Sequence, residues 1–244
     1  RFELGCGRDM LLCGTWALHV SRDGNQLAPK SDWEEICWVS DADIDYLELE
    51  LELEGGVRVQ RQIALAHDDR FLFLADAVLG DQPGKLAYHT CLPLAEGVEF
   101  SPAMESREGC LVGTKRRAMV FPLALAEWRT LWAAGELQAT DSGLELTHEA
   151  KASRLYAPLF FDLDRHRFPR PFTWRRLTVA ELLETQPDDV AVGYRMAIGK
   201  KQWLFYRSLD RVGNRTLLGH NLSTEALIAQ FRSDGEVESL VEVE

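Results

Sequence analysis

Leucine and glutamate alternate almost without interruption in the stretch DYLELELELEGGVRVQRQIALA, which runs from Asp45 to Ala66. Successive side chains of a β-strand point to opposite faces, so a period of two predicts one apolar face and one acidic face. The return strand continues the apolar face with Val57, Val59, Ile63 and Leu65. We therefore predict an antiparallel hairpin whose leucines are covered by another sheet.

The acidic face of this hairpin is expected to lie in water. Its glutamates would then pair in part with three polar residues of the return strand, Arg58, Gln60 and Gln62. A row of charges on a solvated strand face also discourages aggregation between sheet edges.

The register of the hairpin predicts its turn. A two-residue loop at Gly55-Gly56 would place Leu53 opposite Arg58, although residues directly opposite each other share a face of the sheet. A three-residue loop instead pairs leucine with valine or isoleucine, and glutamate with arginine or glutamine. We therefore expect a glycine-containing, bulged turn of three residues.

Two features break the pattern. Arg61 falls in phase with the apolar residues, so we expect it at a sheet edge or in a buried ion pair, because a buried guanidinium needs a partner. Upstream, Asp41, Asp43 and Asp45 fall in phase with the leucines. Aspartates and core leucines do not share a buried face, so we expect a phase slip near Tyr46, through a bulge or a change of element.

The rest of the chain consists of short apolar runs separated by Gly, Pro or Asp-Gly, and the whole sequence predicts about fifteen strands. Only AEWRTLWAA and TVAELLE have short helical character. We predict an all-β fold, a large antiparallel β-sandwich of two stacked sheets with few or no helices, forming a single domain over residues 1–244. The first residue is Arg1 and not Met, so this domain is either a processed or trimmed chain or a fragment of a longer protein.

The net charge of the chain restricts the classes of partner that it can bind. It has 39 acidic and 27 basic residues, a formal net charge of −12. This balance favours solubility and argues against nucleic acid, since nucleic-acid binders need a basic face. No apolar run approaches the roughly 18 residues of a membrane span. The sequence fixes no compartment, although a periplasmic or extracellular location is expected for a glycan-active protein.

Signatures of catalysis and of metal binding are missing from the sequence. GxSxG, HExxH, the P-loop and GxGxxG are all absent. The five cysteines contain no CxxC pair and are expected to be free buried thiols, with a Cys6–Cys13 disulfide as the alternative in an exported protein. The six histidines show no metal-ligand spacing. We therefore expect no metal and no cofactor.

The densest polar cluster is FDLDRHRFPRPFTWRRL, which holds five arginines and no acid between Arg165 and Arg176. Guanidinium groups bind carboxylates and sulfates through planar pairs of hydrogen bonds, and an indole ring stacks on the apolar face of a sugar. The candidate contacts for an anionic sugar polymer are Arg165, His166, Arg167, Arg170, Trp174 and Arg175. Alternatively, these arginines pair with surface acids and bind no ligand.

Three stretches together resemble the C-terminal β-sandwich of heparinase II/III-like polysaccharide lyases: DWEEICWVSDADIDYLELELEL, VQRQIALAHDDRFLFLADAV and QWLFYRSLDRVGNRTLLGHNL. The resemblance implies a sandwich that accompanies β-elimination of uronic-acid glycosides. In that family, most catalytic residues lie on an α/α toroid that precedes the sandwich. This chain contains no toroid, so the resemblance implies no catalytic residue here, and an anionic glycan or a preceding catalytic domain as partner.

These observations lead to three hypotheses of function. The first is a carbohydrate-associated module that binds, or packs next to, an anionic polysaccharide site. The second is a lyase or sugar epimerase-like enzyme that uses a histidine, with His67, His89 and His148 as candidates. The third is a structural or assembly module without a ligand.

Overall fold

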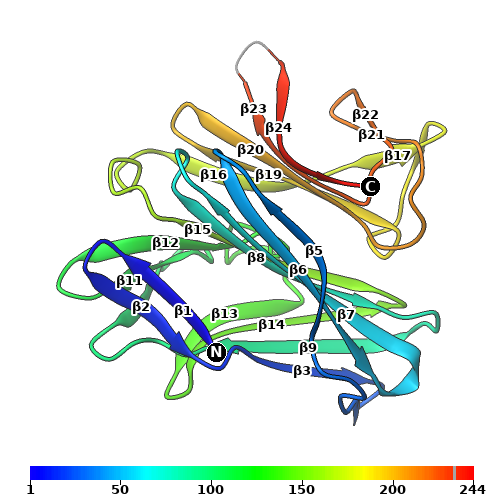
Figure 1. The fold of residues 1–244 in the computed structure, drawn as a ribbon, viewed down its shortest axis with the longest axis horizontal. Helices are drawn as coiled ribbons and strands as arrows, with labels where there is room; N and C mark the ends of the chain where they lie inside the picture. The colour runs from blue at the N-terminus through cyan, green and yellow to red at the C-terminus, as the bar shows by residue number, and fades with distance from the viewer. Residues whose placement is uncertain (233–234) are drawn as a thin grey trace.

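An eight-stranded antiparallel sheet forms the middle layer of the molecule (Figure 1). The computed structural model describes residues 1–232 and 235–244. Across the sheet the strands run in the order β10-β11-β12-β15-β8-β7-β6-β5. Their bounds are β5 Glu34–Ser40, β6 Ile44–Leu53, β7 Val57–Ala66, β8 Phe71–Leu79, β10 Glu99–Pro102, β11 Gly109–Val112, β12 Arg116–Pro122 and β15 Leu155–Asp162.

Two five-stranded antiparallel sheets cover the two faces of this central sheet (Figure 1). The lower sheet is formed by β13 (Gly135–Thr140), β14 (Gly143–Ala152), β9 (Gly84–Leu92), β3 (Ala17–Arg22) and β4 (Asn25–Gln26). The upper sheet is formed by β16 (Phe172–Leu177), β19 (Ala191–Ile198), β20 (Lys201–Ser208), β23 (Ala226–Phe231) and β24 (Val237–Val243).

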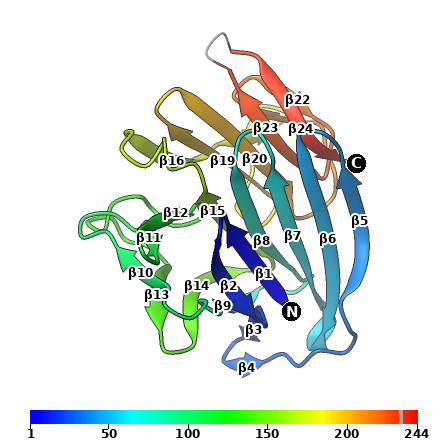
Figure 2. The same cartoon turned by 60° about the vertical axis from the view of Figure 1, so that its left-hand side comes forward.

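Two small sheets complete the fold. A hairpin of β1 (Phe2–Cys6) and β2 (Asp9–Gly14) lies in front of the central sheet (Figure 2). A four-stranded sheet is formed by β18 (Glu184–Thr185), β17 (Val179–Glu181), β21 (Arg215–Leu217) and β22 (His220–Leu222). The predicted all-β antiparallel sandwich is confirmed, although the chain forms three main layers where the sequence predicted two. The predicted number of about fifteen strands is too low: the described residues form 24, because several short strands of two to four residues leave no alternation pattern to recognise.

The two stretches with predicted helical character form no helix in the structure. The AEWRTLWAA stretch is an irregular loop, and TVAELLE contains β17. In the described part of the chain no helix is long and apolar enough to cross a membrane. The run ALIAQFRSDGEVESLVEVE predicts a closing hairpin around Ser233-Asp234-Gly235, and its two strands are present as the β23–β24 pair, while Ser233 and Asp234 lie outside the described residues.

Each face of the central sheet has its own apolar core. The core toward the lower sheet contains Leu51, Leu53, Val57 and Val59. These side chains alternate with residues that face the upper sheet, where a second core contains Phe71, Phe73 and other aromatic residues. A central strand buried on both faces reads as nearly continuous apolar sequence, as β8 does over FLFLADAVL.

The β6–β7 hairpin has the predicted register. Leu53 pairs with Val57, Leu51 with Val59 and Glu52 with Arg58, which leaves a loop of three residues. This loop, Glu54–Gly56, is a single 3₁₀ turn with positive φ at both glycines. The prediction of a three-residue, glycine-containing turn is therefore confirmed.

The predicted exposure of the glutamate face is wrong for part of the strand. Glu52 and Glu54 are exposed, and Glu50 pairs with Arg58 at 3.1 Å as expected. Glu48, however, is 1% exposed. The upper sheet packs on this end of the acidic face, and buried Arg207 of β20 binds the Glu48 carboxylate at 2.8 Å.

Arg61 lies in the buried ion pair that was one of its two predicted environments. Its Nε and Nη2 atoms each donate to the carboxylate of Asp76 at 2.8 Å. The Tyr88 hydroxyl donates to the same carboxylate at 2.7 Å. This bidentate pair satisfies a charge that an apolar core could not otherwise hold.

The aspartates before β6 behave differently from the prediction. Asp41 caps the β5–β6 turn by accepting from the backbone N–H groups of Asp43 and Ile44, and β6 begins only at Ile44. The β6–β7 ladder then runs without a slip, so the slip expected near Tyr46 is absent. Asp45 remains in phase with the leucines and is stabilised by hydrogen bonds from Ser40 and His67.

All five cysteines are free, as expected, but only Cys91 and Cys110 are buried; Cys6, Cys13 and Cys37 are half-buried, so the prediction of burial is wrong for these three. Cys6 lies opposite Asp9 and Cys13 lies opposite Glu3 in the first hairpin, so the strand register does not place the two thiols opposite each other. The alternative Cys6–Cys13 disulfide is therefore not formed.

Candidate anion-binding site

Two of the six predicted contact residues are buried in the protein core. Arg167 is 9% exposed, and its Nε atom donates to Asp162 at 3.0 Å while Nη2 donates to the Asp69 carbonyl at 2.6 Å. Trp174 is 2% exposed and donates its indole N–H to the Leu125 carbonyl at 2.8 Å. Neither side chain is free to contact a glycan, because both anchor the arginine-rich segment to the core.

The other four predicted residues are exposed but do not form one site. His166 and Arg170 lie on the loop after β15 and line no cleft described below. Arg175 lies on β16, beside a cleft formed with the loop after β12. Only Arg165 joins a cluster of other cationic side chains.

That cluster surrounds a cleft of about 520 Å³, here termed the basic cleft. Four segments build it: the β1–β2 turn, the end of β7 with the residue before β8, the β11–β12 turn and the loop after β15. The lining residues are Gly5, Cys6, Gly7, Leu65, Ala66, His67, Arg70, Lys115, Arg116, Arg117, Leu163 and Arg165.

Backbone contacts hold these segments together. The N–H of Leu163 donates to the carbonyl of Arg70 at 2.9 Å, which places Arg70 beside the loop that carries Arg165. Arg70 itself adopts a left-handed conformation with φ of 48°. On the other side, the Cys6 thiol lies 3.8 Å from the Arg117 carbonyl and joins the first hairpin to the β11–β12 turn.

Most of the charge in the basic cleft is uncompensated. Arg70, Lys115, Arg116 and Arg165 are exposed, and none of them forms an ion pair within the described residues. Arg117 differs, because its guanidinium pairs with Asp9. No aspartate or glutamate is among the residues that line the cleft, so its field is strongly positive in a chain of net charge −12.

His67 lies at the rim of the basic cleft and is held by the β5–β6 turn. Its Nε2 atom lies 2.9 Å from Asp45 and its Nδ1 atom lies 3.0 Å from the Ala42 carbonyl. The hydrogen bond to Asp45, followed by the one to Ala42, raises the pKa of His67 above its usual 6.5. Protonation therefore adds a further positive charge at mildly acidic pH.

This arrangement can bind an anion but does not resemble a catalytic centre. Arginine and lysine side chains on separate turns can contact sulfate or carboxylate groups spaced along a chain. Both nitrogens of His67 are occupied by the protein, which leaves no free ring nitrogen for a substrate. In the described residues no group of three or more His, Cys, Asp or Glu could hold a metal ion.

The sequence contained a signal for part of this site that was not used. Lys115, Arg116 and Arg117 are consecutive in GTKRRAM, a basic run in an acidic chain. Arg70 gave no such signal, since its approach to Arg165 depends on the pairing of β8 with β15. Trp128 and Trp132, in the loop after β12, were also missed as exposed aromatic residues.

Comparisons with known proteins give a fold but no family. No family model matches the chain, and no curated protein matches it. Among solved structures, heparan sulfate lyase HepC from Pedobacter heparinus matches 79% of this chain with a TM-score of 0.50 and 12% identity. A structure named heparinase III matches 78% of the chain with a TM-score of 0.51 and 8% identity.

These matches concern the fold alone, because their sequence identity is low. The chain spans 30% of the length of the HepC chain and 29% of the heparinase III chain. The predicted resemblance to heparinase-like proteins is confirmed at the level of the fold.

Proposed function

We propose that this chain is a β-sandwich module of a carbohydrate-processing protein and that its basic cleft binds an anionic polysaccharide. One observation carries the proposal: four cationic side chains without ion pairs line a single cleft of a strongly acidic chain. Unpaired surface cations cost little in water, but their convergence in one concave site favours a polyanionic ligand over isolated small ions.

The names of the structural neighbours agree with this ligand class. One neighbour is named a heparan sulfate lyase, and heparan sulfate is a sulfated, uronic-acid-containing polymer. Since this chain spans only 30% of that neighbour, we also propose that it acts beside a further domain that supplies the catalytic groups. The histidine-dependent enzyme is the less favoured function. His67 has no free nitrogen, His89 is held by Glu145 at 3.4 Å and stacks on His19, and burial lowers the pKa of His148 to about 4.

The test is binding of heparan sulfate by isothermal titration calorimetry, with dextran as an uncharged control polymer. We expect binding of heparan sulfate and none of dextran in the basic cleft. Arg116→Ala and Arg165→Ala should each weaken binding by about two- to fivefold, the size expected for losing one exposed charge contact.

A control variant distinguishes the loss of a contact in the basic cleft from the effect of a change in net charge. Lys30 is exposed, forms no ion pair within the described residues, and bonds through its N–H to Glu52 at the turn end of the β6–β7 hairpin, whereas the basic cleft includes Ala66 at the other end. Lys30→Ala removes the same charge away from the cleft. It should change the affinity by less than twofold. Equal losses in all three variants, or no binding of heparan sulfate, would refute the site. Release of an unsaturated, ultraviolet-absorbing product would favour the enzyme instead.

A further inference from the structure

Two exposed tryptophans project from the loop between β12 and β13. Trp128 is 48% exposed and Trp132 is 84% exposed. Most of the other tryptophans are largely buried, for example Trp174 at 2% and Trp203 at 0%. Exposing an indole forgoes much of the free energy that its burial would supply, so two exposed rings on one loop indicate a contact surface.

The loop that carries these rings is fixed to the protein. Buried Arg107 donates to three of its carbonyls, those of Ala126 at 2.8 Å, Trp128 at 2.5 Å and Leu131 at 2.7 Å. Backbone bridges from Arg107 to Glu127 and from Arg129 to Glu105 add to this support. The tryptophans therefore stand on a preorganised platform, which lowers the entropy cost of binding a ligand.

Trp132 lines two adjoining clefts, which share it with Ala133, Ala134, Glu149 and Ala150. The first, of about 920 Å³, lies between this loop, β14 and β16 and includes Trp128 and Arg175. The second, of about 1090 Å³, lies over the outer face of β14 and β9 and includes Lys85 and Lys151. An elongated ligand that contacts Trp132 can therefore extend into both clefts.

The two clefts contain charges of both signs, unlike the basic cleft, and each is lined by three acidic and two basic residues. Arg176 pairs with Asp188, and Lys85 pairs with Glu149 at 2.8 Å, while Arg175 and Lys151 form no ion pair within the described residues. Thr173 donates to Glu127 at 2.6 Å. These side chains offer both donors and acceptors without an excess of positive charge, the mixture that sugar hydroxyls require.

We propose that this surface is a second glycan site, which binds an uncharged pyranose segment stacked on Trp132. The apolar C–H face of the ring would lie on the indole, and its hydroxyls would exchange hydrogen bonds with the paired side chains of the flanking clefts. The proposal is independent of the basic cleft, from which it differs in ligand charge and in every lining residue.

The experiment is a nuclear magnetic resonance titration of the indole N–H signals with uncharged hexasaccharides. The panel contains gluco-, manno-, xylo- and galacto-configured chains with both α and β linkages, at millimolar concentration. We expect at least one chain to shift the Trp128 and Trp132 signals and to leave the buried Trp174 and Trp203 signals unchanged. Trp132→Ala should weaken that binding by about tenfold, the upper end for loss of one stacked ring.

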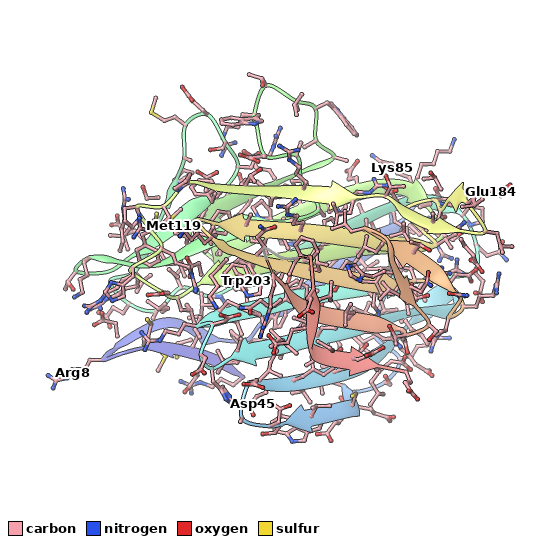
Figure 3. All side chains as sticks on the ribbon, turned by 90° about the horizontal axis from the view of Figure 1, so that it is seen from above. Arg8, Asp45, Lys85, Met119, Glu184 and Trp203 are labelled. Atoms are coloured by element: carbon pink, nitrogen blue, oxygen red, sulfur yellow. The ribbon has the colours of Figure 1, made fainter. Side chains whose placement is uncertain are left out.

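The matched control is Trp38→Ala. Trp38 is 58% exposed on edge strand β5, beside the strand that carries Asp45, and Figure 3 shows Asp45 on the opposite side of the molecule from Lys85. This variant and Arg165→Ala should bind the uncharged chain as the native protein does. The proposal fails if no hexasaccharide of the panel shifts the two signals, or if Trp38→Ala loses affinity as Trp132→Ala does.

Discussion

The guanidinium of Arg61 lies 3.6 Å from the centre of the Trp16 ring and 4.6 Å from that of Trp33, while its nitrogens bind Asp76. Arg61→Ala would leave the buried Asp76 carboxylate without its cation. We expect a loss of about 3–5 kcal/mol in the free energy of unfolding, measured by urea denaturation. Arg58→Ala breaks an exposed pair with Glu50 and should cost less than about 1 kcal/mol. Similar losses in both variants would show that burial does not determine how much an ion pair contributes to the free energy of unfolding.

His67 gives a residue-level prediction of pH dependence. Its pKa in the folded chain is raised above 6.5 by the hydrogen bond to Asp45, so folding favours the protonated form. The resulting stabilisation is complete below pH 6.5 and disappears as the pH rises through the raised value. Asp45→Asn should return the pKa of His67 toward 6.5 in a nuclear magnetic resonance titration and flatten the stability profile above that pH. An unchanged His67 pKa in this variant would contradict the assigned cause.

At the scale of the element, the β6–β7 turn depends on its glycines. Gly56 has a φ of 69° and nothing within 4 Å of an added Cβ, so Gly56→Ala isolates the conformational penalty. We expect a loss of about 1–2 kcal/mol in urea denaturation. Gly113, in the β11–β12 turn, has equally open space without a positive φ, and Gly113→Ala should be nearly neutral or slightly stabilising. Equal effects of the two substitutions would exclude φ as the reason.

The same hairpin shows which features a sequence can predict. Its strands, its register and its three-residue turn depend on neighbours within about twenty residues, and all three follow from side-chain alternation. The burial of Glu48 does not follow from this alternation, because it depends on an ion pair with Arg207, which is 159 residues away in the chain. The same limit applies to the candidate site: the arginine-rich loop was visible, but the burial of Arg167 and Trp174 depends on Asp69 and Leu125.

At the scale of the whole molecule, the predicted exposure of the acidic face of β6 was wrong for Glu48 because a third layer covers this part of the strand. Glu48, Gln60 and Glu225 all bind Arg207, which thereby connects the central sheet to the upper sheet. Asp69 makes a second connection by accepting from Trp203 at 2.6 Å and from Lys201 at 2.9 Å. A polar side chain buried between two layers needs a hydrogen-bonding or ionic partner, so the buried polar residues of this face form contacts between the layers.

The overall charge of the molecule predicts an unusual salt dependence of polyanion binding. The basic cleft attracts an anionic chain locally, whereas the whole protein, at −12, repels it. At about 0.01 M salt the screening length is near 30 Å, so the distant acidic residues repel the ligand. At about 0.1 M salt the screening length falls to near 10 Å, which suppresses this repulsion but leaves the short-range contacts in the cleft. Still higher salt weakens those contacts as well.

Affinity for heparan sulfate, measured by calorimetry across this range of salt concentration, should therefore pass through a maximum near the middle of the range. The double variant with Arg116→Ala and Arg165→Ala should remove the maximum, while Lys30→Ala, which removes a charge away from the cleft, should keep it. A steady fall in affinity from the lowest salt would mean that the distant acids do not act on the ligand, and that the cleft alone sets the electrostatics of binding.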